Sequence, residues 1–115
     1  MTHIKIHYVI KLREISEDIN LVRRIKIDGT VNMPIIQKYH TVVYEFDEKK
    51  MIVDTNEYLE KIFRKFNGRE NPLNTQDNQE KIKSLETHTS MSVGDVIQIN
   101  DKYYSVSGEG FHQVR

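Results

Sequence analysis

Along residues 4–13, apolar side chains occupy the even positions and mostly polar side chains occupy the odd positions. The even positions are Ile4, Ile6, Tyr8, Ile10 and Leu12, and the odd ones include Lys5, His7, Lys11 and Arg13. A period of two over this length predicts a β-strand with one face in the core and the other in water. Such a strand is stable only within a sheet, so later segments have to supply its neighbours.

Two later segments have the composition of further strands. Residues 39–46 are rich in β-branched and aromatic side chains, which predicts a central or near-central strand. Residues 96–99 and 103–106 flank a polar turn, so they predict a β-hairpin.

The segment between the first strand and residue 39 is less clear. Apolar side chains at Leu21, Val22, Ile25 and Ile27 predict a strand that ends at the turn pair Asp28-Gly29, with a short helix beginning at Ser16 as the alternative. Residues 30–37 fit no single element, although Pro34 bars them from the interior of a sheet.

A helix is predicted over residues 55–66. Its apolar side chains fall at helical spacing on one face. They are Leu59, Ile62, Phe63 and Phe66. Asp54 or Thr55 is placed to cap the start, and Asn67-Gly68 suits the end.

These elements predict a single α+β domain over residues 1–115: an antiparallel sheet of four or five strands with one main amphipathic helix packed on one face. Residues 68–89 are expected to be a mobile loop or insertion, with a short helix over residues 79–86. The expected core comprises Ile4, Ile6, Tyr8, Ile10, Val42, Tyr44, Val96 and Ile99, together with the apolar face of the helix.

The composition of the chain excludes several classes of functional site and counts against others. The chain has no cysteine, which rules out disulfides, zinc-thiolate sites and cysteine nucleophiles. The formal net charge is zero, which counts against a dedicated nucleic-acid binder. We expect no signal peptide, no membrane segment and a place in the cytoplasm of a host cell.

No cofactor or metal site is expected either. His3 and His7 share a strand face, but residues four apart in a strand are about 13 Å apart and cannot share a metal ion. Gly108-Glu109-Gly110 lacks the lysine and the helix that follow a phosphate loop, and no strained serine turn is present. The sequence therefore gives no positive sign of an enzyme.

The segment from Ser90 to Ile97, Ser-Met-Ser-Val-Gly-Asp-Val-Ile, allows two interpretations. Gly94 and Asp95 suit a turn that leads into a strand, which is a purely structural role. Alternatively, Ser90, Ser92 and Asp95 form a polar rim that holds a partner.

The same segment carries a resemblance, together with Tyr44, residues 59–67, Pro72, Tyr104 and Gly110-Phe111. Their order resembles the YodL-like domain family, which comprises small or embedded domains encoded by phages, plasmids and other mobile elements, with similar proteins in viruses of archaea. The resemblance covers roughly the second two thirds of the chain and implies a viral or mobile-element accessory protein. Thr89 stands where the family commonly has an arginine, and the segment before it is longer than usual.

We therefore expect a non-enzymatic module that binds a host or viral protein, and the resemblance adds counter-defence as its purpose. The expected contact residues are Met91, Tyr103 and Phe111. The alternative is a nucleic-acid-binding accessory protein whose basic face comprises Arg23, Arg24, Lys26, Arg64 and Lys65. An open edge strand would also permit a homodimer.

Overall fold

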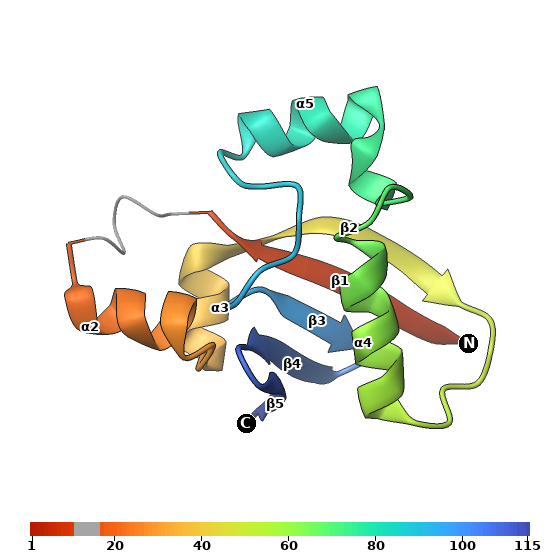
Figure 1. Cartoon of the computed structure of the whole chain (residues 1–115), viewed down its shortest axis with the longest axis horizontal. Coiled ribbons are helices and arrows are strands. Elements are labelled where there is room, and N and C mark those ends of the chain that lie inside the picture. The colour runs from red at the N-terminus through yellow and green to blue at the C-terminus, as the bar shows by residue number, and fades with distance from the viewer. Residues whose placement is uncertain (11–16) are drawn as a thin grey trace.

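The computed structural model describes residues 1–10 and 17–115. A five-stranded sheet, antiparallel throughout, forms the centre of the molecule, with the strand order β2-β1-β3-β4-β5 (Figure 1). The strands are β1 (Thr2–Val9), β2 (His40–Glu48), β3 (Val96–Ile99), β4 (Lys102–Ser107) and β5 (Gly110–Val114). The predicted α+β fold and the predicted hairpin of β3 and β4 are confirmed.

Helices accompany the sheet along the chain. They are α2 (Ile19–Val22), which continues into a π-helical turn (Arg23–Ile27), α3 (Met33–Tyr39), α4 (Thr55–Lys65) and α5 (Gln76–Ser84), with a 3-10 turn (Pro72–Asn74) before α5. The predicted helix over residues 55–66 corresponds to α4, and the carboxylate of Asp54 caps it by accepting from the Glu57 N–H at 3.1 Å. Within the described residues, no helix has the length and apolar character needed to cross a membrane.

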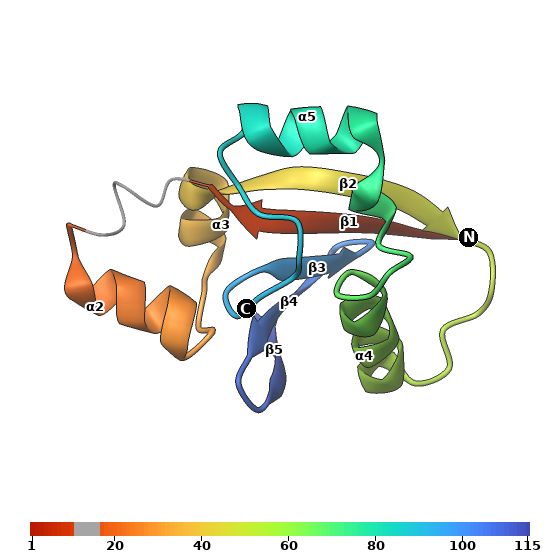
Figure 2. The same ribbon diagram turned by 45° about the horizontal axis from the view of Figure 1, so that its top comes forward.

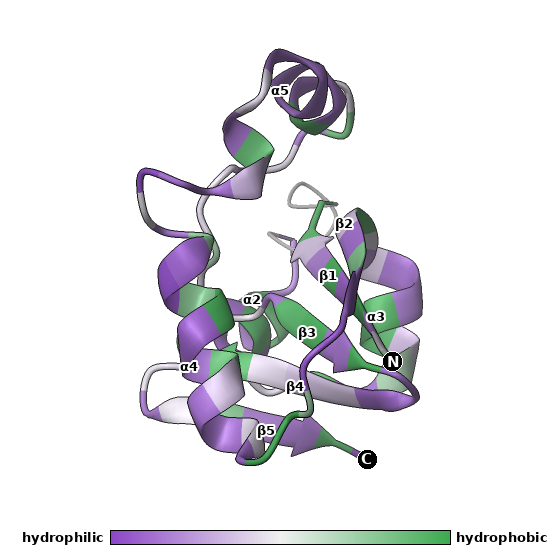
Figure 3. Cartoon of the chain, turned by 90° about the vertical axis from the view of Figure 1, so that its right-hand side faces the viewer, coloured by the Kyte–Doolittle hydropathy of each residue, from purple (hydrophilic) through white to green (hydrophobic). Residues whose placement is uncertain are grey.

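The core is divided between the two faces of the sheet, because neighbouring residues of a strand point to opposite sides. Ile97 belongs to the first core with Leu59, Ile62 and Phe66 of α4. Val96 belongs to the second core with Ile25 of the π-helical turn and Ile35 of α3. Figure 3 shows the sheet between α4 and α3. The prediction of a single main helix on one face was therefore incomplete.

Residues 21–27 are helical, so the prediction of a strand there was wrong. The Asp18 carboxylate accepts hydrogen bonds from the backbone N–H groups of Asn20 and Leu21, at 3.1 and 3.2 Å, and so starts a helix. Ile25 then lies one turn beyond Leu21 and is fully buried in the second core. The predicted part of β1 beyond residue 10 and the alternative helix start at Ser16 fall outside the described residues.

Strand β2 lies at an edge of the sheet, although its composition predicted a central position. The pairing with β1 shifts register between Ile6 and His7. As a result, Val43 rather than Val42 is buried, at 1% exposure. Ile10, Val42, Tyr44 and Ile99 of the expected core are only partly buried, whereas Ile4, Ile6, Tyr8 and Val96 are fully buried.

The segment expected to be a loop or insertion contributes to the first core. Leu73 and Ile82 are buried there, and the expected short helix is α5, which begins three residues earlier, at Gln76. The buried Asn71 amide donates to the carbonyl oxygens of Phe66, at 2.6 Å, and Thr89, at 3.1 Å. These bonds connect the end of α4 to the segment that leads into β3. In Figure 2, α5 lies beside β2, at the edge of the sheet opposite β5.

Candidate functional site

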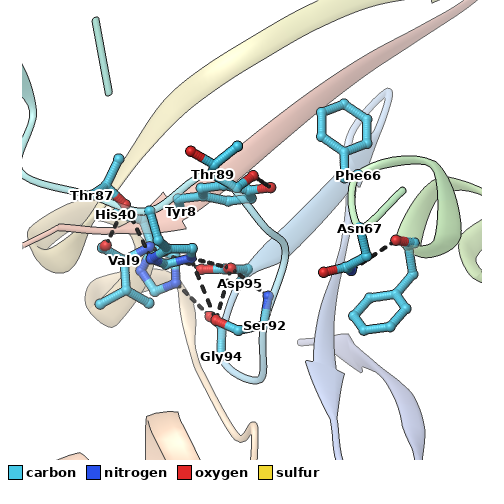
Figure 4. Close-up of polar contacts among 12 residues, drawn as sticks. Tyr8, Val9, His40, Phe66, Asn67, Thr87, Thr89, Ser92, Gly94 and Asp95 are labelled. Atoms are coloured by element: carbon cyan, nitrogen blue, oxygen red, sulfur yellow. Dashed lines mark hydrogen bonds and ion pairs between the residues drawn. The ribbon is translucent and has the colours of Figure 1, made fainter. Parts of the chain in front are cut away.

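A buried polar cluster surrounds Asp95, the residue that precedes β3 (Figure 4). The Asp95 side chain is fully buried, and its carboxylate accepts from the backbone N–H groups of Val9, at 3.1 Å, and Ser92, at 2.8 Å. His88 Nε2 lies 2.6 Å from the Asp95 Oδ2 atom. A buried carboxylate is costly unless it is hydrogen-bonded, and here several donors satisfy it.

The ring of Tyr8 supports this cluster from the first core. It stacks on the ring of His88, with 4.5 Å between ring centroids and 14° between the planes. The Tyr8 hydroxyl donates to the Thr89 carbonyl oxygen at 3.0 Å, and burial raises the pKa of this phenol. Tyr8 therefore stays protonated and serves as a hydrogen-bond donor that positions the loop before β3.

The turn before β3 depends on a glycine at position 94. Its φ is +94°, and a Cβ atom there would lie 2.5 Å from the backbone oxygen of Ile25. The Gly94 carbonyl oxygen accepts from His40 Nε2 at 2.7 Å, and burial lowers the pKa of His40. A neutral His40 that carries its proton on Nε2 satisfies this bond.

Ser92, His88 and Asp95 contain the three side-chain types of a hydrolase triad, but they are arranged differently. In a triad, the acid and the nucleophile contact opposite nitrogens of the imidazole. Here the Ser92 Oγ atom, at 3.4 Å, and the Asp95 carboxylate both lie beside His88 Nε2. His88 Nδ1 lies 3.4 Å from Thr87 Oγ1, which donates its proton to the Val9 carbonyl oxygen. This arrangement fastens residues 87–95 to β1, which is the structural interpretation of the Ser-Val-Gly-Asp segment.

A second feature is an apolar hollow of about 460 Å³ between α4 and the turn that joins β4 to β5. Phe63 of α4 and Phe111 of β5 meet edge to face in its wall, with 6.4 Å between ring centroids and 76° between the planes. Val93 and Val106 add aliphatic surface, and Gly108 forms part of the turn at its margin. We name this feature the α4–β5 hollow.

The rim of the α4–β5 hollow carries both signs of charge. Glu60 and Arg64 of α4 are exposed and line it. The remaining polar side chain in the lining is Ser107, whose hydroxyl donates to the Gly110 carbonyl oxygen at 3.1 Å. An apolar floor with a charged rim suits the binding of an apolar side chain rather than proton transfer.

A protein of Acanthamoeba polyphaga mimivirus, "Uncharacterized protein R785", is 42% identical to this chain over 77 residues. The matched region comprises 67% of this chain and 70% of the mimivirus protein. The chain belongs to the family of this mimivirus protein. No family model matches the chain. No solved structure matches it either. The resemblance to YodL-like domains stays a prediction.

The structure separates the three contact residues expected from the sequence of this family member. Phe111 lines the α4–β5 hollow. Tyr103 points to the opposite face, where it is half-buried against the second core and its ring lies 5.7 Å from that of His7. Met91 is 2% exposed and belongs to the first core, so the expectation that it contacts a partner has to be corrected. Its apolar character serves packing instead.

The expected basic face is also divided. Arg23, Arg24 and Lys26 belong to the π-helical turn, which packs on the second core. Arg64 and Lys65 lie on α4, which packs on the first core, on the other side of the sheet. Moreover, the Lys65 ammonium lies 5.7 Å from the centroid of the Phe46 ring. These five residues therefore do not form one surface.

Two features of the structure escaped prediction from the sequence. The hollow joins α4 to β5, and β5 itself was not predicted, because only Phe111 and Val114 of this short strand are large apolar residues. The contact of His88 with Asp95 joins residues seven apart in an irregular loop, a spacing that belongs to no motif. The sequence signal that could have found the hollow is Phe63, which was assigned to the core.

Proposed function

We propose that this chain is a non-enzymatic accessory protein that binds a host or viral protein through the α4–β5 hollow. The observation that carries the proposal is the pair of aromatic rings, Phe63 and Phe111, in the wall of an apolar depression that is open at the surface. Protein interfaces concentrate their affinity in such places, where one anchor side chain leaves water and charged residues surround it.

The chemistry of the hollow defines the anchor of the partner. Its volume of about 460 Å³ accommodates a large aliphatic or aromatic side chain. The partly buried rings of Phe63 and Phe111 favour an aromatic anchor, because aromatic rings pack edge to face with a gain beyond burial alone. Glu60 and Arg64 can pair with charged residues that flank this anchor.

Family membership supports the biological setting of this proposal. The related protein comes from a mimivirus. The resemblance to YodL-like domains suggests a mobile-element origin. A small viral protein with an apolar binding site suits a role in blocking a host protein. Counter-defence is the purpose that we propose for this binding.

The test blocks the hollow without disturbing the fold. A Cβ atom at Gly108 would meet no atom within 4 Å, so Gly108→Trp places a large ring at the margin of the hollow without strain. The matched control is Asp101→Trp, which adds the same ring at an exposed turn of the same sheet, between β3 and β4. Both variants, and the wild type, are tagged and mixed with lysate of the host cell after nuclease treatment.

We expect the wild type and Asp101→Trp to capture the same protein partner, and Gly108→Trp to lose it. Capture that depends on intact nucleic acid would contradict the proposal and favour the nucleic-acid alternative. Equal capture by all three proteins would show that the partner binds elsewhere on the molecule. Circular dichroism confirms that each variant is folded before the comparison.

A further inference from the structure

Strand β5 is an edge strand without the features that normally prevent strand pairing. Within the described residues, it pairs with β4 and with no other strand. Its sequence from Gly110 to Val114 contains no charged residue and no proline. His112 and Gln113 are exposed. The outward-facing N–H and C=O groups of such an edge form a template for another strand.

The residues at the two ends of β5 carry opposite charges, and this indicates which strand pairs with β5. Glu109 precedes the strand and Arg115 follows it, and both side chains are exposed. If a second β5 lies antiparallel to the first, with His112 opposite His112, then Glu109 of each copy lies opposite Arg115 of the other. The arrangement forms two ion pairs and leaves no like charges in contact along the edge.

We propose that β5 pairs with β5 of a second copy of this chain, antiparallel about a two-fold axis at His112. Self-pairing about a two-fold axis is necessarily antiparallel, which agrees with a sheet that is antiparallel throughout. A formal net charge of zero also means that two copies repel each other only weakly.

The dimer would join the two sheets into one continuous sheet. Phe111 of one protomer lies opposite Gln113 of its partner, on the face that also carries α4. The two α4–β5 hollows then open on the same face of this sheet, on either side of the axis. The pairing does not depend on what the hollows bind, so it can be tested independently of the proposed function.

The test measures the mass of the full chain by sedimentation equilibrium across a dilution series. We expect the wild type to dimerise reversibly. His112→Glu places two carboxylates directly opposite each other, and should raise the dissociation constant of the dimer by about tenfold or more. The His112 side chain is exposed, so this variant should keep the wild-type fold, which circular dichroism checks.

A charge exchange tests the register. Glu109→Arg alone sets like charges opposite each other and should weaken the dimer, whereas Glu109→Arg combined with Arg115→Glu should restore it. The backbone N–H of residue 109 keeps its bond to Ser107 Oγ, 3.3 Å long, in these variants. The proposal is overturned if the wild type is monomeric at every concentration, if His112→Glu dimerises as tightly as the wild type, or if the double exchange fails to restore pairing.

Discussion

The two edges of the sheet differ in almost every property that controls strand pairing. Strand β2 carries Glu45, Asp47 and Glu48, shifts register opposite Ile6 and His7, and contacts both α3 and α5. Strand β5 is shorter and uncharged, and it contacts α4 on one face. Charge, bulges and covering helices are the usual means of protecting an edge. Among residues 1–10 and 17–115, the β2 edge is therefore closed, whereas the β5 edge is open.

The two edges differ in role: β2 contributes to the stability of the fold, whereas β5 lies beside the surfaces that we propose for binding. Val43 of β2 is buried in the first core, whereas β5 contributes side chains that are only partly buried. The closed edge belongs to the structural half of the molecule, next to the polar cluster that fastens residues 87–95 to β1. The open edge borders the α4–β5 hollow. Both surfaces that we propose for binding thus lie at the same end of the sheet.

The largest expected effect compares one substitution at the two edges. Val43→Ala removes two methyl groups from a site that is 1% exposed, and should lower the free energy of unfolding by about 2 kcal/mol. Val114→Ala changes a partly buried site of β5, and should cost about 1 kcal/mol or less. Urea denaturation of dilute protein measures both. Equal losses would mean that β5 is as much a part of the core as β2.

A moderate effect is expected when the charges of the closed edge are removed. The double variant Glu45→Thr with Asp47→Thr should also associate through β2. Oligomers larger than the dimer should then form at a concentration about tenfold lower than in the wild type. Glu70→Thr with Glu80→Thr is the control, because it removes the same charge from exposed positions outside the sheet. Light scattering distinguishes the two. If the control associates equally, net charge rather than the edge is responsible.

The smallest effect concerns the imidazole of His3 on β1, which lies beside acidic side chains of β2. His3 lies 2.7 Å from the Asp47 carboxylate and 3.0 Å from that of Glu45, and these hydrogen bonds raise the pKa of His3 above 6.5. The folded state then binds the proton more tightly than the unfolded chain. This contribution to stability is fully present below about pH 6.5 and is lost as the pH rises through the raised pKa.

Proton NMR of the His3 ring measures this titration directly. In the wild type, the midpoint should lie above 6.5, and Asp47→Asn should move it downward, because Asp47 is the main cause of the shift. A wild-type midpoint at or below 6.5 would show that the carboxylates of β2 do not stabilise the protonated form of His3.

Local patterns in the sequence predicted the elements that local forces determine. Helix α4 follows from its apolar face and the Asp54 cap, and β1 follows from its alternation. The strand prediction for residues 21–27 failed because Ile25 and Ile27 have the alternation of a strand, while Leu21 and Ile25 also have the spacing of a helix. Burial of Ile25 against Gly94, far along the chain, decides between the two.

Features that depend on distant pairing could not be predicted. The place of β2 at an edge is set by how β1 and β3 pair, and nothing in the composition of residues 39–46 encodes this order. Met91 was expected to contact a partner, yet its side chain is buried in the first core. The α4–β5 hollow requires the contact of Phe63 with Phe111, which lie on elements far apart in sequence.

Amide hydrogen exchange of the wild-type chain, measured in dilute and in concentrated solution, tests the difference between the edges most directly. Pairing through β5 should slow the exchange of the outward-facing amides of residues 110–114 as the concentration rises, because these N–H groups become hydrogen-bonded. The amides of β2 should exchange at the same rate in both solutions. Slower exchange in β2 with no change in β5 would contradict the account.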